Sequence, residues 1–150
     1  MSAGKAVGQT VTGIVEAALY VKDVLAASAF YRDLFGFEEE ITNEQISVLR
    51  VPGRQALILF PQSTVATSGG VTPPNAIEGT IPPHGGAGGR LHVAFSIRPE
   101  ELEPWRERLT ARGVKIEGVV RWKRGGTSLY FRDLDEHLIE LITPGLWSFY

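Results

Sequence analysis

The chain has 150 residues, of which 43% are hydrophobic and 21% charged, as is usual for one folded domain or for two small modules that share a core. The formal net charge is −2 and no long basic run is present, so neither nucleic acid nor an anionic membrane is expected as a partner. Cysteine is absent, which excludes disulfides, thiolate metal sites and cysteine nucleophiles.

The N-terminal stretch MSAGKAVGQT lacks the apolar segment of a secretory signal. No apolar run approaches the ~20 residues that a membrane span needs. These two features predict neither a secretory signal nor a membrane span, and the absence of cysteine favours a cytoplasmic location.

Residues 13–62 are predicted to form a first module with one helix and four strands. The first strand covers residues 14–21, and Asp23 then offers a helix N-cap. The helix that follows is expected to end at Gly36, because glycine readily adopts the left-handed conformation of a helix C-terminus. Three short strands complete the module, at residues 37–41, 46–51 and 56–60.

Residues 63–89 are predicted to be a linker loop. The stretch from 69 to 89 is rich in glycine and holds four of the nine prolines of the chain, which rules out a helix or a central strand. Long loops inside compact domains are usually functional or disordered.

Residues 90–144 repeat the order of the first module, and residues 145–150 form a C-terminal tail. The first strand covers residues 91–97, and a helix starts at Pro99 and ends at Gly113. The strands that complete the module are expected at residues 114–120, 128–132 and 138–143. The sequence therefore predicts an α+β protein with two βαβββ modules.

Side chains alternate along a strand, so each first strand has a small, polar face. Glu16 shares its face with Ala18 and Tyr20, and His92 shares its face with Ala94 and Ser96. Small side chains with a polar group among them are typical of a cavity wall. The opposite faces are apolar and suited to packing a helix; they comprise Val15, Ala17, Leu19 and Val21 in one strand and Val93, Phe95 and Ile97 in the other.

Glu140 lies at the centre of the apolar strand LIELI, where an unpaired carboxylate is costly to bury. Glu16, His92 and Glu140 on one inner surface would suit a divalent cation such as Mn, Fe, Co, Ni or Zn. Three protein ligands would leave positions open for water and substrate. The alternatives are a glutamate paired with an arginine and a histidine hydrogen-bonded for structural reasons.

Three segments of the chain resemble the vicinal oxygen chelate superfamily, which includes glyoxalase I, bleomycin-resistance proteins, fosfomycin-resistance enzymes and extradiol dioxygenases. They are EAALYVKDVLAASAFYRDLFGFE, LHVAFSI and SLYFRDLDEHLIELITP, and the resemblance extends over roughly residues 13–144. It implies two βαβββ modules that form a partly open mixed β-barrel around a central cavity with a divalent metal. It also implies a homodimer, with modules paired within one chain or swapped between chains.

By this resemblance, Glu16, His92 and Glu140 fall at metal-ligand positions of the superfamily. Ile58 occupies the place in the first module that Glu140 has in the second, so the fourth ligand of glyoxalase I is missing. Extradiol dioxygenases use two histidines and one glutamate on Fe(II), whereas this chain has Glu16 in place of one histidine. The fosfomycin-resistance enzymes also use three ligands, with histidine in the first place.

Four further residues are predicted to contact a substrate: Ser128, Tyr130, Arg124 and His84. In the fosfomycin-resistance enzymes a tyrosine at the place of Tyr130 touches substrate. Arg124 would bind an anionic group and His84 would fold over the cavity. The alternatives are a strand aromatic with an exposed hydroxyl for Tyr130, a solvated turn residue for Arg124 and a loop histidine without a role for His84. Trp122 and Trp147 either line the pocket or pack in the core.

The resemblance leads to a function hypothesis and a rival. The hypothesis is a divalent-metal enzyme of the glyoxalase and dioxygenase type, acting on a small oxygenated molecule by isomerase, lyase, epoxide-opening transferase or dioxygenase chemistry. Glu16 or Glu140 would move a proton, with Tyr130 beside them. The rival is a metal-free protein that sequesters a ligand, as bleomycin-resistance proteins do.

Overall fold

The structure is a computed structural model that describes residues 13–62, 76–79, 81, 84 and 89–150. Most of the predicted linker therefore lies outside the described residues. The first module comprises β1 (Glu16–Val21), α1 (Val24–Phe35), β2 (Glu38–Thr42), β3 (Ser47–Val51) and β4 (Gln55–Pro61). The second comprises β5 (His92–Ser96), the 3₁₀ turn η1 (Pro99–Glu101), α2 (Leu102–Ala111), β6 (Gly118–Arg121), β7 (Thr127–Arg132) and β8 (Leu138–Ile142).

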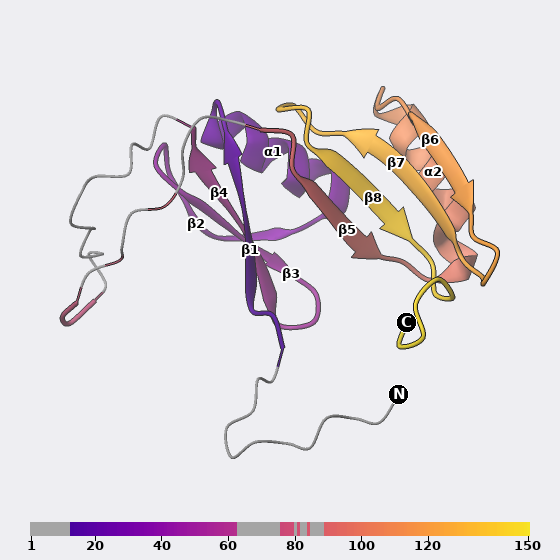
Figure 1. The fold of residues 1–150 in the computed structure, drawn as a ribbon. Helices are drawn as coiled ribbons and strands as arrows, with labels where there is room; N and C mark the ends of the chain where they lie inside the picture. The colour runs from indigo at the N-terminus through magenta and orange to yellow at the C-terminus, as the bar shows by residue number, and fades with distance from the viewer. Residues whose placement is uncertain (1–12, 63–75, 80, 82–83, 85–88) are drawn as a thin grey trace, which may run out of the picture.

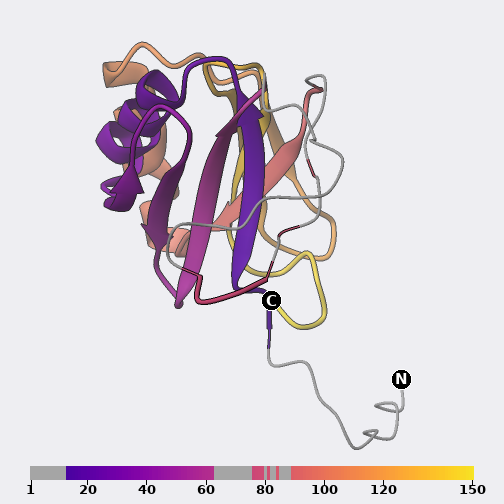
Figure 2. The same ribbon diagram turned by 90° about the vertical axis from the view of Figure 1, so that its left-hand side faces the viewer.

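Within the described residues the strands form two four-stranded mixed sheets with the same topology. Their orders are β1-β4-β3-β2 and β5-β8-β7-β6, and in each sheet the first strand pairs in parallel with the last. The predicted α+β fold with two βαβββ modules is confirmed. Figure 1 shows the two sheets side by side, and Figure 2 shows both helices on the same side of the molecule. The other face of each sheet is turned away from the helices.

The ends of α1 follow from local sequence. The Asp23 side chain accepts a hydrogen bond from the backbone N–H of Ala26 at 3.0 Å, as an N-cap does. Gly36 has a φ of 74° and donates its N–H to the carbonyl of Arg32. The buried face of the helix carries Val24, Ala27, Ser28, Tyr31 and Leu34.

Two predictions about strands were wrong in part. β6 starts at Gly118 rather than at residue 114, because the N–H of Val114 bonds the carbonyl of Leu109 and so completes the end of α2. Val15 and Ala17 are exposed, whereas Leu19 and Val21 are buried. The reason is that α1 packs on β2, β3 and β4, so that the start of the edge strand β1 is left uncovered.

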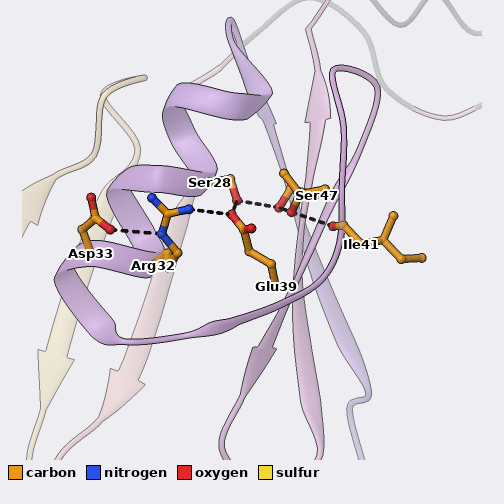
Figure 3. Close-up of polar contacts among 7 residues, drawn as sticks. Ser28, Arg32, Asp33, Glu39, Ile41 and Ser47 are labelled. Atoms are coloured by element: carbon orange, nitrogen blue, oxygen red, sulfur yellow. Dashed lines mark hydrogen bonds and ion pairs between the residues drawn. The ribbon is translucent and has the colours of Figure 1, made fainter.

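A polar cluster joins α1 to the first sheet (Figure 3). The hydroxyl of Ser28 donates to Glu39 at 2.9 Å and lies 2.8 Å from the hydroxyl of Ser47. Arg32 donates to the same Glu39 oxygen at 3.3 Å and to Asp33 at 3.1 Å. Ser28 and Ser47 are completely buried, and these bonds supply the partners that buried hydroxyls need.

The two modules share one apolar core. Phe35 at the end of α1 lies 5.0 Å from Phe95 and 5.4 Å from Trp105, measured between ring centroids. Arg108 of α2 donates to the backbone carbonyls of Leu34 and Asp33, which are free at the C-terminal end of α1. Among the described residues no helix is long and apolar enough to cross a membrane.

The turn before β8 fastens the second module to the first. Tyr31 donates its hydroxyl proton to Asp133 at 2.6 Å, and the backbone N–H of Lys22 donates to Asp135 at 2.8 Å. His137 is completely buried, and its Nε2 lies 2.9 Å from the carbonyl oxygen of Tyr20. The end of β1 that meets the second module is therefore the Tyr20 end.

Candidate metal and substrate site

His92 and Glu140 lie side by side on the second sheet. β5 and β8 are parallel neighbours, with Ala94 opposite Glu140 and His92 opposite Leu138. Nε2 of His92 is 3.1 Å from Oε1 of Glu140. Ile139 and Leu141 point to the opposite face and are completely buried in the core, so Glu140 must point away from the helices.

The hydrogen bonds of His92 define its tautomer. Its Nδ1 lies 2.8 Å from the carbonyl oxygen of Leu138, which can only accept, so Nδ1 carries a proton. In neutral His92 the other ring nitrogen, Nε2, then has a lone pair directed at a carboxylate oxygen of Glu140. Two lone pairs at this distance require a proton or a cation between them.

Glu140 is buried with only 6% of its surface exposed, and its second oxygen also has a partner. The hydroxyl of Ser128 donates to Oε2 of Glu140 at 2.5 Å. Ser128 itself is completely buried, and it accepts a hydrogen bond from the indole N–H of Trp122 at 2.9 Å. Hydrogen bonds thus link Trp122 to Ser128 and Ser128 to Glu140, and His92 faces the other oxygen of Glu140; these four residues are named here the Trp122–His92 chain.

Tyr130 lies on the same face, directly opposite Glu140 in the β7–β8 pair. Its ring centroid is 6.4 Å from that of His92. Burial raises the pKa of Tyr130 above 10.0 and the charge of Glu140 adds to this, while the hydroxyl of Ser128 acts in the opposite direction. The phenol therefore stays protonated at neutral pH, able to donate a hydrogen bond to a substrate oxygen.

Glu16 is not part of this group within one chain. It is exposed at the start of β1, four residues or about 13 Å before Tyr20, where β1 meets the second module. Within the described part of the chain, no three histidine, aspartate or glutamate side chains gather closely enough to hold an ion. Of the three predicted ligands, the structure brings together His92 and Glu140.

The remaining predicted substrate residues lie in two other places. Arg124 is exposed in the turn between β6 and β7. Nδ1 of His84 is 2.6 Å from the hydroxyl of Tyr20, and its ring is 4.8 Å from that of Phe60. His84 therefore lies against the open face of the first sheet, apart from the group around Glu140.

The register of the sheets agrees with the predicted equivalence of Ile58 and Glu140. Ile58 pairs with Ala18 as Glu140 pairs with Ala94. Two residues earlier, Glu16 pairs with Ala56 as His92 pairs with Leu138. An apolar side chain therefore stands in the first sheet where the second has its buried carboxylate.

The donor set fits a divalent cation. A histidine that binds a metal through one nitrogen usually donates its other N–H to a carbonyl or carboxylate, as Nδ1 of His92 does here. The 3.1 Å between His92 Nε2 and Glu140 Oε1 is close to the separation of adjacent ligands on one ion, about 3 Å at bond lengths near 2.1 Å. Imidazole and carboxylate suit Mn, Fe, Co, Ni or Zn.

The fold is that of a known class of proteins. The model of the Glyoxalase/Bleomycin resistance protein/Dioxygenase superfamily matches residues 13–141, most of the chain. The chain belongs to this superfamily, also called the vicinal oxygen chelate superfamily, and the resemblance stated from the sequence is confirmed.

Individual relatives span two kinds of enzyme. The crystal structure of lactoylglutathione lyase from Agrobacterium tumefaciens has a TM-score of 0.77 and 33% identity, covering 93% of this chain and 98% of that one. The fosfomycin resistance protein FosX from Listeria monocytogenes, complexed with Mn(II) and sulfate, has a TM-score of 0.63 and 25% identity, covering 91% and 94% of the two chains.

A shorter match shows higher identity. The fosfomycin resistance protein FosX of Listeria innocua is 43% identical over 51 residues, which are 33% of this chain and 38% of that protein. The match thus spans less than half the length of this relative.

Sequence reasoning left the role of Trp122 open between the pocket and the core. Strand alternation predicts the face on which Trp122 lies. Trp122 is two residues after Val120 and therefore on the same face, and Val120 pairs with Ser128. The indole therefore lies on the face that carries Glu140. That its N–H points at Ser128 is visible only in the tertiary structure.

Proposed function

We propose that this protein is a divalent-metal-dependent enzyme that acts on a small oxygenated molecule. The observation that carries the proposal is the pair formed by His92 and Glu140. The carbonyl of Leu138 orients the imidazole so that its free nitrogen and the carboxylate face the same point. The relative FosX from Listeria monocytogenes supports Mn(II) as the first metal to test.

When bound, the metal would act as a Lewis acid that polarises a substrate oxygen. The side chains of this protein would do the rest. Tyr130, kept protonated by its raised pKa, would donate a hydrogen bond to the substrate. Glu140, or Glu16 at the exposed start of β1, would accept and return a proton. Arg124 and His84 remain proposed substrate contacts.

Among the reaction classes, opening of an epoxide or a similar strained oxygen ring is favoured over isomerisation of the glyoxalase type. Ile58 stands at the position of the fourth ligand of glyoxalase I. The three proposed ligands that remain, Glu16, His92 and Glu140, equal in number those of the fosfomycin-resistance enzymes. Replacement of a histidine by Glu16 argues against oxygenation of the extradiol type. The fosfomycin resistance relatives agree with this order, whereas the lactoylglutathione lyase from Agrobacterium tumefaciens does not, so the order rests on Ile58.

The third ligand is proposed to come from a second copy of the chain. Glu16, Ala17 and Ala18 are all exposed, so the start of β1 is uncovered on both faces. A homodimer with swapped modules would cover this strand and bring Glu16 to the His92 and Glu140 of the other copy. A cytoplasmic location and a small-molecule substrate belong to the same proposal.

A second function is supported by a different observation. Tyr20, Phe60 and His84 form an aromatic group on the open face of the first sheet, with Tyr20 and Phe60 stacked at 5.9 Å. Such a surface would stack against a flat aromatic ligand, as a metal-free sequestering protein of the bleomycin-resistance type requires.

Elemental analysis of protein purified without chelator or affinity tag tests the first proposal. We expect about one transition-metal ion per site in the parent and little or none in Glu140→Gln, which keeps the size of the side chain but removes the charge of the proposed ligand. Glu44→Gln, in the exposed loop before β3, is the matched control and should retain the metal. A parent that takes up neither Mn, Fe, Co, Ni nor Zn contradicts the enzyme and favours the ligand-binding protein.

A panel of small substrates then tests the reaction. Metal-loaded protein should open epoxides in preference to isomerising thiol adducts of 2-oxoaldehydes or cleaving catechols. Turnover of the catechols alone would contradict the proposed order.

A further inference from the structure

We propose that Trp122 and Ser128 are positioning residues that hold Glu140 in the orientation in which it binds the metal. The inference rests on the function proposed above. It concerns the Trp122–His92 chain, in which the two hydrogen bonds that lead from Trp122 to Glu140 each have a defined direction.

The direction starts at the indole. The Nε1–H of Trp122 can only donate, so the hydroxyl oxygen of Ser128 must accept that bond. The single proton of Ser128 is then free for Oε2 of Glu140, which lies 2.5 Å away. At the other end, the carbonyl of Leu138 holds Nδ1–H of His92 and leaves Nε2 facing Oε1 of Glu140.

Because Ser128 is buried, it can orient Glu140 but cannot readily contact a substrate. Ser128 has no exposed surface. Its proton is donated to the Glu140 carboxylate, and its oxygen accepts the bond from the Trp122 indole. The hydroxyl therefore acts through Glu140 rather than on a substrate. Its donation to Oε2 leaves Oε1 as the oxygen of Glu140 that faces His92.

The turn that carries Trp122 is firmly held to the end of β8. The N–H of Trp122 donates to the carbonyl of Gly126, and the N–H of Gly125 donates to the carbonyl of Trp122, both at 3.1 Å. The N–H of Thr127 donates to the hydroxyl of Thr143, just beyond β8. The turn that carries the Trp122 indole and the strand that carries Glu140 are thus held together by hydrogen bonds.

Loss of the indole N–H would remove the donor that the Ser128 oxygen has among the described residues, so the hydroxyl could rotate away from Oε2 of Glu140. Partners in a metal site that do not touch the ion typically change metal affinity by about 10- to 100-fold when removed. A positioning role therefore predicts weaker metal binding without a loss of folding.

The test compares Trp122→Phe, which keeps an aromatic ring but removes the N–H, with Ser128→Ala and with the double variant. Trp147→Phe is the control, because Trp147 is 55% exposed near the C-terminus and stacks on Phe149. Affinity for Mn²⁺ alone is measured from the electron paramagnetic resonance signal of the free ion. The ¹³C signal of the Glu140 carboxyl is measured in metal-free protein, assigned with Glu140→Gln.

We expect Trp122→Phe to bind Mn²⁺ about tenfold more weakly and Ser128→Ala about 10- to 100-fold more weakly, at melting temperatures close to that of Trp147→Phe. The double variant should bind no more weakly than Ser128→Ala, because Trp122 acts through Ser128. The Glu140 carboxyl signal should move in Trp122→Phe and stay in place in Trp147→Phe.

Two results overturn the inference: a Trp122→Phe protein with the carboxyl signal and the Mn²⁺ affinity of Trp147→Phe, or losses of affinity that add in the double variant. A parent that binds neither Mn²⁺ nor, in the elemental analysis, Fe, Co, Ni or Zn overturns the proposed function instead. The carboxyl signal of the metal-free protein then decides by itself whether Trp122 orients Glu140.

Discussion

Tyr31 shows how much one side chain contributes to the joining of the two modules. It lies on α1 in the first module, is completely buried, and donates to Asp133 of the second module at 2.6 Å. Asp133 also accepts from the backbone N–H groups of Asp135 and His137 through its other oxygen. The carboxylate is thus satisfied only when the modules are joined.

Tyr31→Phe is expected to lower the free energy of unfolding by about 1–3 kcal/mol, because it leaves one oxygen of the buried Asp133 carboxylate without a partner. Urea unfolding at pH 7 measures the loss. Tyr150→Phe is the control, since Tyr150 is partly exposed and water can replace its bond to the carbonyl of Ile142. Equal losses in the two variants would contradict a special role for Tyr31.

The same residue predicts a pH dependence. Burial raises the pKa of Tyr31 well above its usual 10.0, and the charge of Asp133 adds to the effect. Above pH 10 the unfolded chain releases this proton while the folded protein keeps it, so the stability that Tyr31 provides is present below pH 10 and is lost as the pH rises further. The parent should lose up to about 1.4 kcal/mol per pH unit more than Tyr31→Phe, measured by urea unfolding between pH 9 and 11.

At the scale of elements, the hairpin between β6 and β7 is the most closely packed turn around the site. Gly126 has a φ of +83°, and a Cβ there would lie 2.6 Å from the carbonyl oxygen of Thr143. A Cβ on Gly145 would lie 2.6 Å from the carbonyl carbon of Gly125, whereas a Cβ on Gly125 would lie 3.4 Å from the Cα of Gly145. Backbone atoms cannot give way as flexible side chains do, so this contact requires glycine.

Gly126→Ala should therefore lower the free energy of unfolding by about 1–3 kcal/mol, through both the clash and the positive φ. Gly89→Ala is the matched control, since a Cβ there meets nothing within 4 Å, and it should change stability by less than about 0.5 kcal/mol. Thermal unfolding of the two variants provides the comparison. A Gly126→Ala protein as stable as Gly89→Ala would show that the turn has room to move.

At the scale of the whole molecule, the open faces of the two sheets raise the question of which chain completes the metal site. Glu16 begins β1, whereas β1 meets the second module through its Tyr20 end. The apolar core lies on the helix side and is shared by both modules, so one chain is held together without using the open faces. Among the described residues, His84 lies against Tyr20 and Phe60 on the first open face, while the exposed start of β1 would be available to a second copy.

Mixing two variants, each defective in one ligand, distinguishes the possible pairings. Glu16→Ala and Glu140→Ala should each bind metal weakly. If modules swap, a mixed dimer has one site with both defects and one intact site, so random mixing restores about a quarter of the sites. If each chain builds its own site, mixing restores none. Metal content after joint refolding is the measurement, and each variant refolded alone is the control.

The sequence alone determined the parts of this protein that depend on local rules. Asp23 and Gly36 mark the ends of α1, because an N-cap acceptor and a residue of left-handed conformation are local requirements. The alternation of strands predicted the small, polar face that His92 shares with Ala94, and the repeat of the modules predicted Ile58 as the counterpart of Glu140.

The tertiary structure alone decided which partners those residues meet. It fixed the tautomer of His92 through Leu138, directed Trp122 at Ser128, and separated Glu16 from the other two predicted ligands within one chain. These contacts join strands and modules that are distant in the sequence. The periodicity of a strand defines the face on which a side chain lies, whereas its partner across a sheet or a module boundary depends on register and packing.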